Sequence, residues 1–255
     1  MYRLALLLVT LLLGPCLAGP SPARAGEVRV LASAAVKPLL DGLAPRFEGE
    51  TGHRLVVQYG TGAGLRSRIE AGEPFDVALL ASGPADDLAR SGRLSPEPRP
   101  VIGVTAASLA YRTGGTRPDV GTSEALRAAL LGAASISLSD PALGGASSSF
   151  FTAAVKRLGL EEALRGKLVL TGAGDGARPV ATGAAEFGVA LSSEVAGVEG
   201  VSAVPLLPGD PAATTRLVAA ISSAAAEPDG ARSLVRFLLS PEAMVARRAR
   251  GLAGE

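Results

Sequence analysis

The chain has 255 residues, and its 25 basic and 24 acidic side chains give a net charge of +1. This near balance, without any block of Lys and Arg, argues against nucleic acid as a partner. The sequence contains one cysteine and one histidine, which excludes disulfides and leaves cysteine or histidine metal sites without local support. A chain of this length can bury a full α/β core, as one large domain or as two lobes.

The first 25 residues have the pattern of a secretory signal peptide. Arg3 provides the positive n-region, residues 4–13 form an apolar core, and an A-x-A motif occupies 23–25. The apolar core is too short to span a membrane. Cys16 raises the alternative of a lipoprotein, but proline precedes it where a small residue is expected. We therefore expect cleavage after Ala25 and soluble export.

From residue 26 onward, short apolar runs alternate with helical patterns. The runs predict strands at 28–31, 55–59, 76–80, 101–105, 108–112, 135–138, 168–171, 186–191, 201–206 and 216–221. Apolar residues at helical spacing predict helices at 36–47, 65–71, 84–91, 122–131, 148–158, 160–165, 178–182, 229–239 and 241–250. This alternation predicts an α/β fold in which helices cover a parallel sheet.

Four of the predicted strands lead into a helix through a corner of small residues. The corners are 32–35, 60–64, 139–147 and 172–176. Such a corner leaves N–H groups free at the start of the helix, and with the helix dipole they favour a bound anion. Tight connections between strands and helices also require small residues. For any single corner, this requirement explains the sequence at least as well as a bound anion does. Four corners with Ser, Thr or free N–H but little charge favour capture of a small solute.

The corners form two pairs, separated by the extended stretch 101–112. We therefore predict a first lobe of residues 26–105 and 206–255, and a second lobe of residues 106–205. The predicted solute contacts come from all four corners. They are Ser33, Ala34, Ala35, Thr61, Gly62, Ala146, Ser147, Asp175 and Gly176.

The motifs of several enzyme classes are missing. Position 65 is leucine where G-x-G-x-x-G needs glycine, Gly166-Lys167 is followed by leucine where a P-loop needs Ser or Thr, and G-x-S-x-G does not occur. Without a recognisable nucleophile–base pair, we expect a binding protein and not an enzyme, with no cofactor and no metal ligands. A ligand-sensing regulator would need a helix-turn-helix where the signal peptide stands.

Several charged residues near the corners allow two interpretations. Lys37, Arg66 and Arg178 each lie in the first turn after a corner, where positive charge opposes the helix dipole. They are either solvated or placed to meet an anion. Asp175 either lies at the solute site or caps a helix, and Asp76 is interpreted as a structural cap.

Four segments together resemble the periplasmic solute-binding proteins of molybdate-type ABC importers. They are V-x-V-L-A-S-A-A-V-K-P-L-L from Val28, G-T-G-A-G-L-R-S-R-I-E-A-G-E-P-F-D-V from Gly60, S-D-P at 139–141 and G-D-G-A-R at 174–178. The resemblance covers nearly all of the chain after residue 25. It implies a type II periplasmic binding protein fold, in which two α/β lobes joined by two crossover segments close on an oxyanion. It also implies a membrane permease as partner, and we expect a monomer.

The family's oxyanion contacts correspond to positions near Ala35, Gly62, Ala146, Gly176 and Leu191. The serines expected at the first two positions are alanine and glycine here, and the tyrosine expected at the last is leucine. Ser33 and Thr61 lie nearby and offer hydroxyls instead. The resemblance favours molybdate or tungstate as the ligand. A small carboxylate is the alternative, because Arg66 or Arg178 would bind it with two parallel hydrogen bonds.

Overall fold

The computed structural model describes residues 26–254, so the predicted signal peptide lies outside the described residues. The strands within this range are β1 (Glu27–Ser33), β2 (Arg54–Gly60), β3 (Val77–Ala81), β4 (Val101–Arg112), β5 (Ile136–Ser139), β6 (Leu168–Thr171), β7 (Phe187–Leu191), β8 (Val201–Pro205) and β9 (Thr214–Ile221). The α-helices are α1 (Lys37–Thr51), α2 (Gly62–Glu70), α3 (Ser82–Arg90), α4 (Ser123–Gly132), α5 (Ala146–Arg157), α6 (Glu161–Leu164), α7 (Arg178–Thr182), α8 (Ser192–Val195), α9 (Pro228–Leu238) and α10 (Pro241–Ala249).

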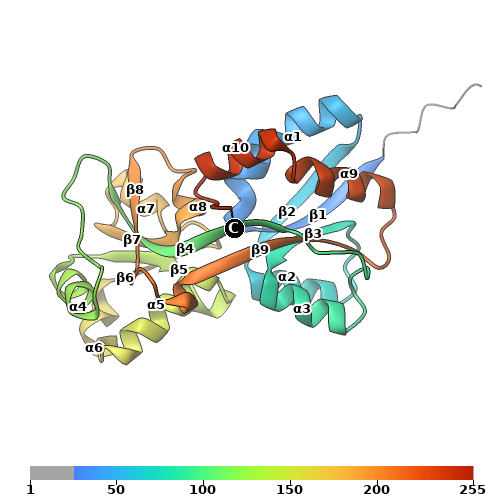
Figure 1. Ribbon diagram of the computed structural model, residues 1–255. Helices are drawn as coiled ribbons and strands as arrows, with labels where there is room; N and C mark the ends of the chain where they lie inside the picture. The colour runs from blue at the N-terminus through green and yellow to red at the C-terminus, as the bar shows by residue number, and fades with distance from the viewer. Residues whose placement is uncertain (1–25, 255) are drawn as a thin grey trace, which may run out of the picture.

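The strands form one path in the order β2-β1-β3-β9-β4-β7-β5-β6, with β8 added beside β4. Two parallel blocks, β2-β1-β3 and β6-β5-β7, stand at its ends. The sheet is not parallel throughout, because β9 runs antiparallel to β3 and β4, and β4 runs antiparallel to β7 and β8. These two long strands cross the middle of the molecule, as Figure 1 shows, and they carry the chain between the blocks without a crossover helix.

The two parallel blocks are the sheets of two lobes. The first lobe contains β1–β3 with α1–α3, α9 and α10, and the second contains β5–β8 with α4–α8 (Figure 1). Each lobe has its own core, with Phe47 among the fully buried side chains of the first and Phe151 among those of the second. Among residues 26–254, no helix combines the length and the apolar character that crossing a bilayer requires.

The exchange of strand partners suggests where the lobes meet. Up to Ala106, β4 pairs with β9, and from Ala107 it pairs with β7. Leu206 and Ala213 pack in the core of the second lobe. We propose that the chain enters the second lobe at Ala107 and leaves it after Ala213, later than the return at residue 206 predicted from the sequence.

Candidate functional site

A cavity of about 320 Å³ lies between the two lobes, at the carboxyl ends of their parallel strands. All four corners contribute to its lining. Six of the nine predicted contact residues line it, namely Ser33, Ala34, Thr61, Gly62, Ala146 and Ser147. The cavity is also lined by four residues that are not among the predicted contacts, namely Ser139, Gly174, Glu194 and Thr215.

The other three predicted contacts do not line this cavity. Ala35 is fully buried in the core of the first lobe. Gly176 lies against the backbone of β7, where an added Cβ would come within 2.1 Å of the Val189 carbonyl oxygen. Asp175 lines a neighbouring cavity of about 360 Å³ and pairs with Arg178 at 3.2 Å. The fourth corner therefore reaches the interlobe cavity through Gly174.

The first corner places a serine hydroxyl at the cavity. Ser33 ends β1 and caps a 3-10 turn at Ala34–Val36, where its Oγ accepts a hydrogen bond from the Ala35 N–H at 3.3 Å. Among the described residues, no group accepts the Ser33 hydroxyl hydrogen. Ser33 can therefore donate this hydrogen to a bound anion.

The second and third corners aim two helix N-termini at the cavity. At the start of α2, the N–H groups of Gly62 and Ala63 have no partner within the helix. Helix α5 begins after Gly145 without a side-chain cap, so the N–H groups of Ala146 and Ser147 are similarly free of helix partners. Partial positive charge therefore faces the cavity from both lobes.

The lobes touch each other beside the cavity. The Thr61 hydroxyl, on the first lobe, donates a hydrogen bond to the Leu143 carbonyl of the second lobe. An added Cβ on Gly144 would come within 2.5 Å of the Ala63 Cβ, and one on Gly174 within 2.6 Å of the Ala34 Cβ. These contacts close the lobes around the cavity.

We expect Thr61→Ala to weaken both the helix and this closure. Thr61 Oγ1 also accepts the Gly64 N–H at 3.1 Å as the N-cap of α2. Losing such a cap costs about 0.5–2 kcal/mol of stability. Urea unfolding should show this loss in Thr61→Ala, whereas Thr61→Ser keeps the hydroxyl and should remain close to wild type. Equal losses in the two variants would assign the effect to the methyl group.

The three cations near the corners are each paired with an acid. Lys37 contacts Asp41 at 2.8 Å, and Arg178 contacts Asp175. The remaining one, Arg66, lines the cavity and pairs with Glu70 at 2.8 Å and with Asp87.

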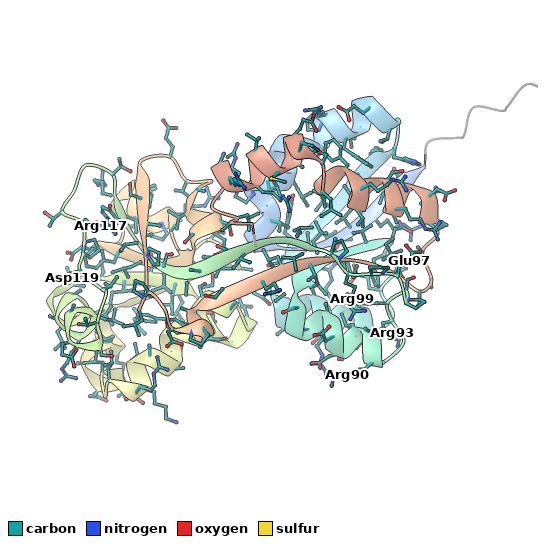
Figure 2. All side chains as sticks on the ribbon, in the orientation of Figure 1. Arg90, Arg93, Glu97, Arg99, Arg117 and Asp119 are labelled. Atoms are coloured by element: carbon teal, nitrogen blue, oxygen red, sulfur yellow. The ribbon has the colours of Figure 1, made fainter. Side chains whose placement is uncertain are left out.

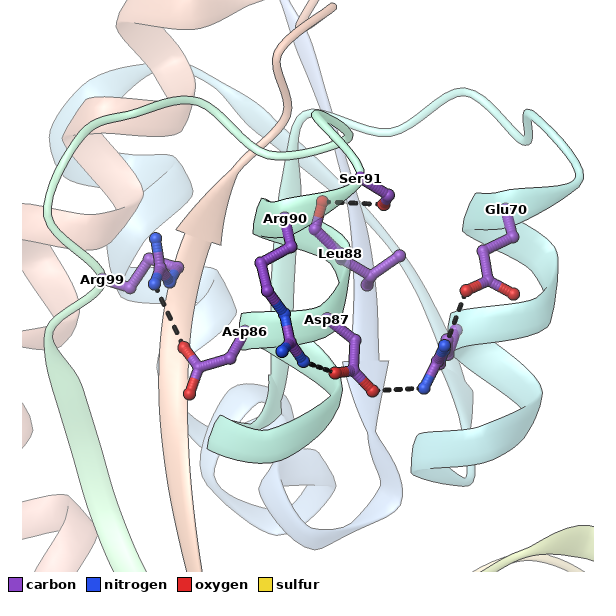
Figure 3. A network of polar contacts seen from close by, with 8 residues as sticks. Glu70, Asp86, Asp87, Leu88, Arg90, Ser91 and Arg99 are labelled. Atoms are coloured by element: carbon purple, nitrogen blue, oxygen red, sulfur yellow. Dashed lines mark hydrogen bonds and ion pairs between the residues drawn. The ribbon is translucent and has the colours of Figure 1, made fainter.

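Asp87 also accepts a hydrogen bond from Arg90, which extends the network along α3 (Figure 3). Arg93 and Arg99, which Figure 2 labels near Arg90, lie in the segment that follows α3. The positive charge of Arg66 at the cavity is thus partly compensated by acids of α2 and α3.

Glu194, on α8 in the second lobe, brings a carboxyl group to the cavity. Its Oε2 folds back and accepts the Leu191 N–H at 2.8 Å. Burial raises the pKa of Glu194 to about 7, and the negative charge of Asp175 contributes to the rise. In the sequence, the only sign of this site residue was its position three residues after a predicted strand end. Helix α8 has four residues, too few to show the helical spacing of apolar residues.

Comparison with known proteins agrees with this architecture. The sequence model of the bacterial extracellular solute-binding protein family matches residues 28–252. An aconitate isomerase from Pseudomonas sp is 29% identical over 254 residues, which is 96% of each chain. The molybdate-binding protein ModA of Azotobacter vinelandii is 30% identical over 237 residues, which is 90% of each chain.

Solved structures confirm the two-lobed fold. The periplasmic molybdate-binding protein of Azotobacter vinelandii matches with a TM-score of 0.72 and 20% identity, over 89% of this chain and 99% of that one. The substrate-binding domain of a putative molybdenum ABC transporter from Clostridium difficile matches with a TM-score of 0.64 and 18% identity, over 91% and 100%. The chain belongs to the bacterial extracellular solute-binding proteins, as a divergent member of the molybdate type.

Proposed function

We propose that this solute-binding protein captures a small anion in the interlobe cavity and delivers it, in the periplasm, to the permease of an ABC importer. The observation that carries the proposal is the convergence of the α2 and α5 N-termini on one cavity. Free N–H groups and helix dipoles stabilise negative charge. The Ser33 hydroxyl adds a donor, which an anion without protons needs because it only accepts hydrogen bonds.

Molybdate or tungstate is the first candidate ligand. Two features support it: the 30% identity to a molybdate-binding protein, and a lining of donors that carries little net charge. Backbone N–H groups at Gly62 and Ala146 need no particular side chain to bind an oxyanion. A tetrahedral dianion would therefore fit the donors even without the family's serines and tyrosine.

A small carboxylate is the second candidate, and three observations favour it. Arg66 at the cavity offers a guanidinium, which matches carboxylate geometry. One water takes up about 30 Å³ in the liquid, so a cavity of about 320 Å³ leaves room beyond the five atoms of a tetrahedral oxyanion. One relative over the whole chain carries the name aconitate isomerase. That name, and a cavity carboxyl with a pKa of about 7, make isomerisation of a bound carboxylate the enzymatic alternative.

A thermal-shift panel separates the two ligand classes. The mature protein is heated with molybdate, tungstate, sulfate, phosphate, citrate and cis- or trans-aconitate. A ligand at about 100 times its Kd stabilises the native state by about 2.7 kcal/mol, which should raise the Tm by about 5–10 °C for a chain of this length. We expect such a shift with molybdate and tungstate if the first candidate is right, and with the carboxylates alone if the second is.

Two further outcomes bear on the proposal. Proton NMR of cis-aconitate incubated with the protein reports isomerisation directly, and conversion would overturn the assignment as a binding protein without catalysis. If no anion in the panel shifts the Tm, capture of a small anion in this cavity is refuted.

A further inference from the structure

The interlobe cavity holds one acidic group that anion capture does not explain. Glu194 lines this cavity and also the neighbouring cavity beside Asp175. Ala34 and Gly174 are the other two residues shared by both cavities, and they form the contact between the lobes. The Glu194 carboxyl therefore lies where the two lobes meet around the site.

One oxygen of this carboxyl is free to contact a ligand. Oε2 accepts the Leu191 N–H, whereas Oε1 has no hydrogen-bond partner within residues 26–254. An added Cβ on Gly174 would lie 3.6 Å from Oε1, which places this oxygen beside the cavity wall.

Within residues 26–254, no cation forms an ion pair with Glu194. The charged groups that line the two cavities around it are Lys37 and Asp41 from α1, Arg66 from α2, Asp175 and Arg178 from the fourth corner and α7, and Arg250 after α10. Three of these cations pair with other acids, and no ion pair reaches Glu194 within the described residues. Strands β7 and β8 carry no titratable side chain, and the two of β4, Tyr111 and Arg112, lie at its far end beside β8.

A bound anion would add a second uncompensated negative charge to this site. Two like charges that face each other in a cavity disfavour ionisation of both, so one of them takes up a proton. A protonated carboxyl also supplies an O–H donor that an anion can accept. We propose that Glu194 contacts the bound anion through its protonated carboxyl group, so that capture of the anion takes up a proton. This inference rests on the proposed capture of an anion in the cavity.

The expected pH dependence follows from the pKa of about 7 in the free protein. Below this pKa the carboxyl is already protonated, and affinity is highest. Above it each capture event must also bind a proton, so affinity falls about tenfold per pH unit and about 100-fold between pH 6 and pH 9. The complex should take up about 0.5 proton at pH 7 and about 0.9 proton at pH 8.

Isothermal titration calorimetry with molybdate and with trans-aconitate measures both quantities. Proton uptake by the wild type, measured in buffers of different ionisation enthalpy, needs no variant. Glu194→Gln keeps a neutral donor of the same shape and should lose most of the pH dependence that comes from the protein. Glu48→Gln is the matched control, because Glu48 also accepts a backbone N–H, from Leu55 at 2.8 Å, but lies outside the cavity lining.

The outcomes separate this inference from the proposed function. A wild type that binds either anion without proton uptake, or a Glu194→Gln variant with unchanged pH dependence, overturns the role of Glu194 and leaves anion capture intact. A wild type that binds neither anion between pH 6 and pH 9 refutes capture of both probes and, with it, the inference.

Discussion

Gly174→Ala is expected to weaken anion capture at least tenfold. In the structure a Cβ at this position would lie 2.6 Å from the Ala34 Cβ of the other lobe, and real Cβ atoms do not approach so closely. The new methyl group would hold the lobes apart at one edge of the cavity. Since a tenfold loss of affinity corresponds to about 1.4 kcal/mol, a small obstacle to closure is sufficient.

Backbone strain must be separated from this interlobe clash. Gly174 has φ +76°, a region that alanine enters only at a cost, so the substitution also lowers stability. Gly200→Ala is the matched control, because Gly200 has φ +73° and an added Cβ would meet no atom within 4 Å. We expect both variants to lose similar stability on urea unfolding, and only Gly174→Ala to lose affinity.

A second pair repeats the comparison at the other interlobe contact. Gly144, with φ +67°, faces Ala63 across the lobes, whereas Gly159, with φ +63°, meets no atom within 4 Å. Calorimetry with the anion that gives the largest thermal shift measures affinity, and small-angle scattering with this anion reports closure. Equal affinities of Gly144→Ala and Gly159→Ala would show that this contact does not limit capture.

The sequence predicted most of the fold because most elements have a strong local signal. Helix α1 buries Leu39, Leu40, Leu43 and Phe47 at helical spacing, and β3 is a run of buried apolar residues, so each was placed within a few residues of its observed bounds. The four-residue helix α8 was missed, because one turn shows no period. The antiparallel direction of β4 and β9 was missed as well, since strand direction depends on partners distant in sequence.

The sequence predicted those parts of the candidate site that lie at the ends of predicted strands. Ser33 ends β1 and Thr61 follows β2 directly, so their place at the sheet edge follows from the pattern. That the Thr61 hydroxyl would donate to Leu143, or that Arg66 would pair with Asp87, depends on contacts between distant segments. Glu194 reaches the cavity only because α8 packs beside the cavity. A single glutamate in the sequence does not predict that position.

The largest loss of stability is expected from Asp76→Ala, far from the candidate site. The side chain is 1% exposed, and its carboxylate accepts three backbone hydrogen bonds. Oδ2 accepts the Arg29 N–H at 2.8 Å, and Oδ1 accepts the N–H groups of Ala226 at 2.7 Å and Glu227 at 3.0 Å. These bonds confirm the structural role expected for Asp76, because they tie β1 to the connection that leads into α9.

Removing this carboxylate leaves three backbone donors without their acceptor. Hydrogen bonds to a charged group contribute about 1.5–3 kcal/mol each, and they are not additive, so we expect Asp76→Ala to lower the free energy of unfolding by about 3–5 kcal/mol. The Tm should fall by about 10 °C. Asp76→Asn keeps one acceptor oxygen and should lose less. Urea unfolding measures both variants.

The control for Asp76→Ala is an exposed aspartate with similar bonding. Asp119 accepts the Gly121 N–H at 3.1 Å from a surface loop of the second lobe, where Figure 2 labels it beside Arg117. Water replaces the lost acceptor there, so Asp119→Ala should change stability by less than about 1 kcal/mol. Asp76 precedes β3, whose other end, Ala81, lines the cavity. The folded Asp76→Ala variant should therefore keep the wild-type affinity for the captured anion. A loss of stability no larger than that of Asp119→Ala would contradict the role of Asp76 as the buried tie between β1 and α9.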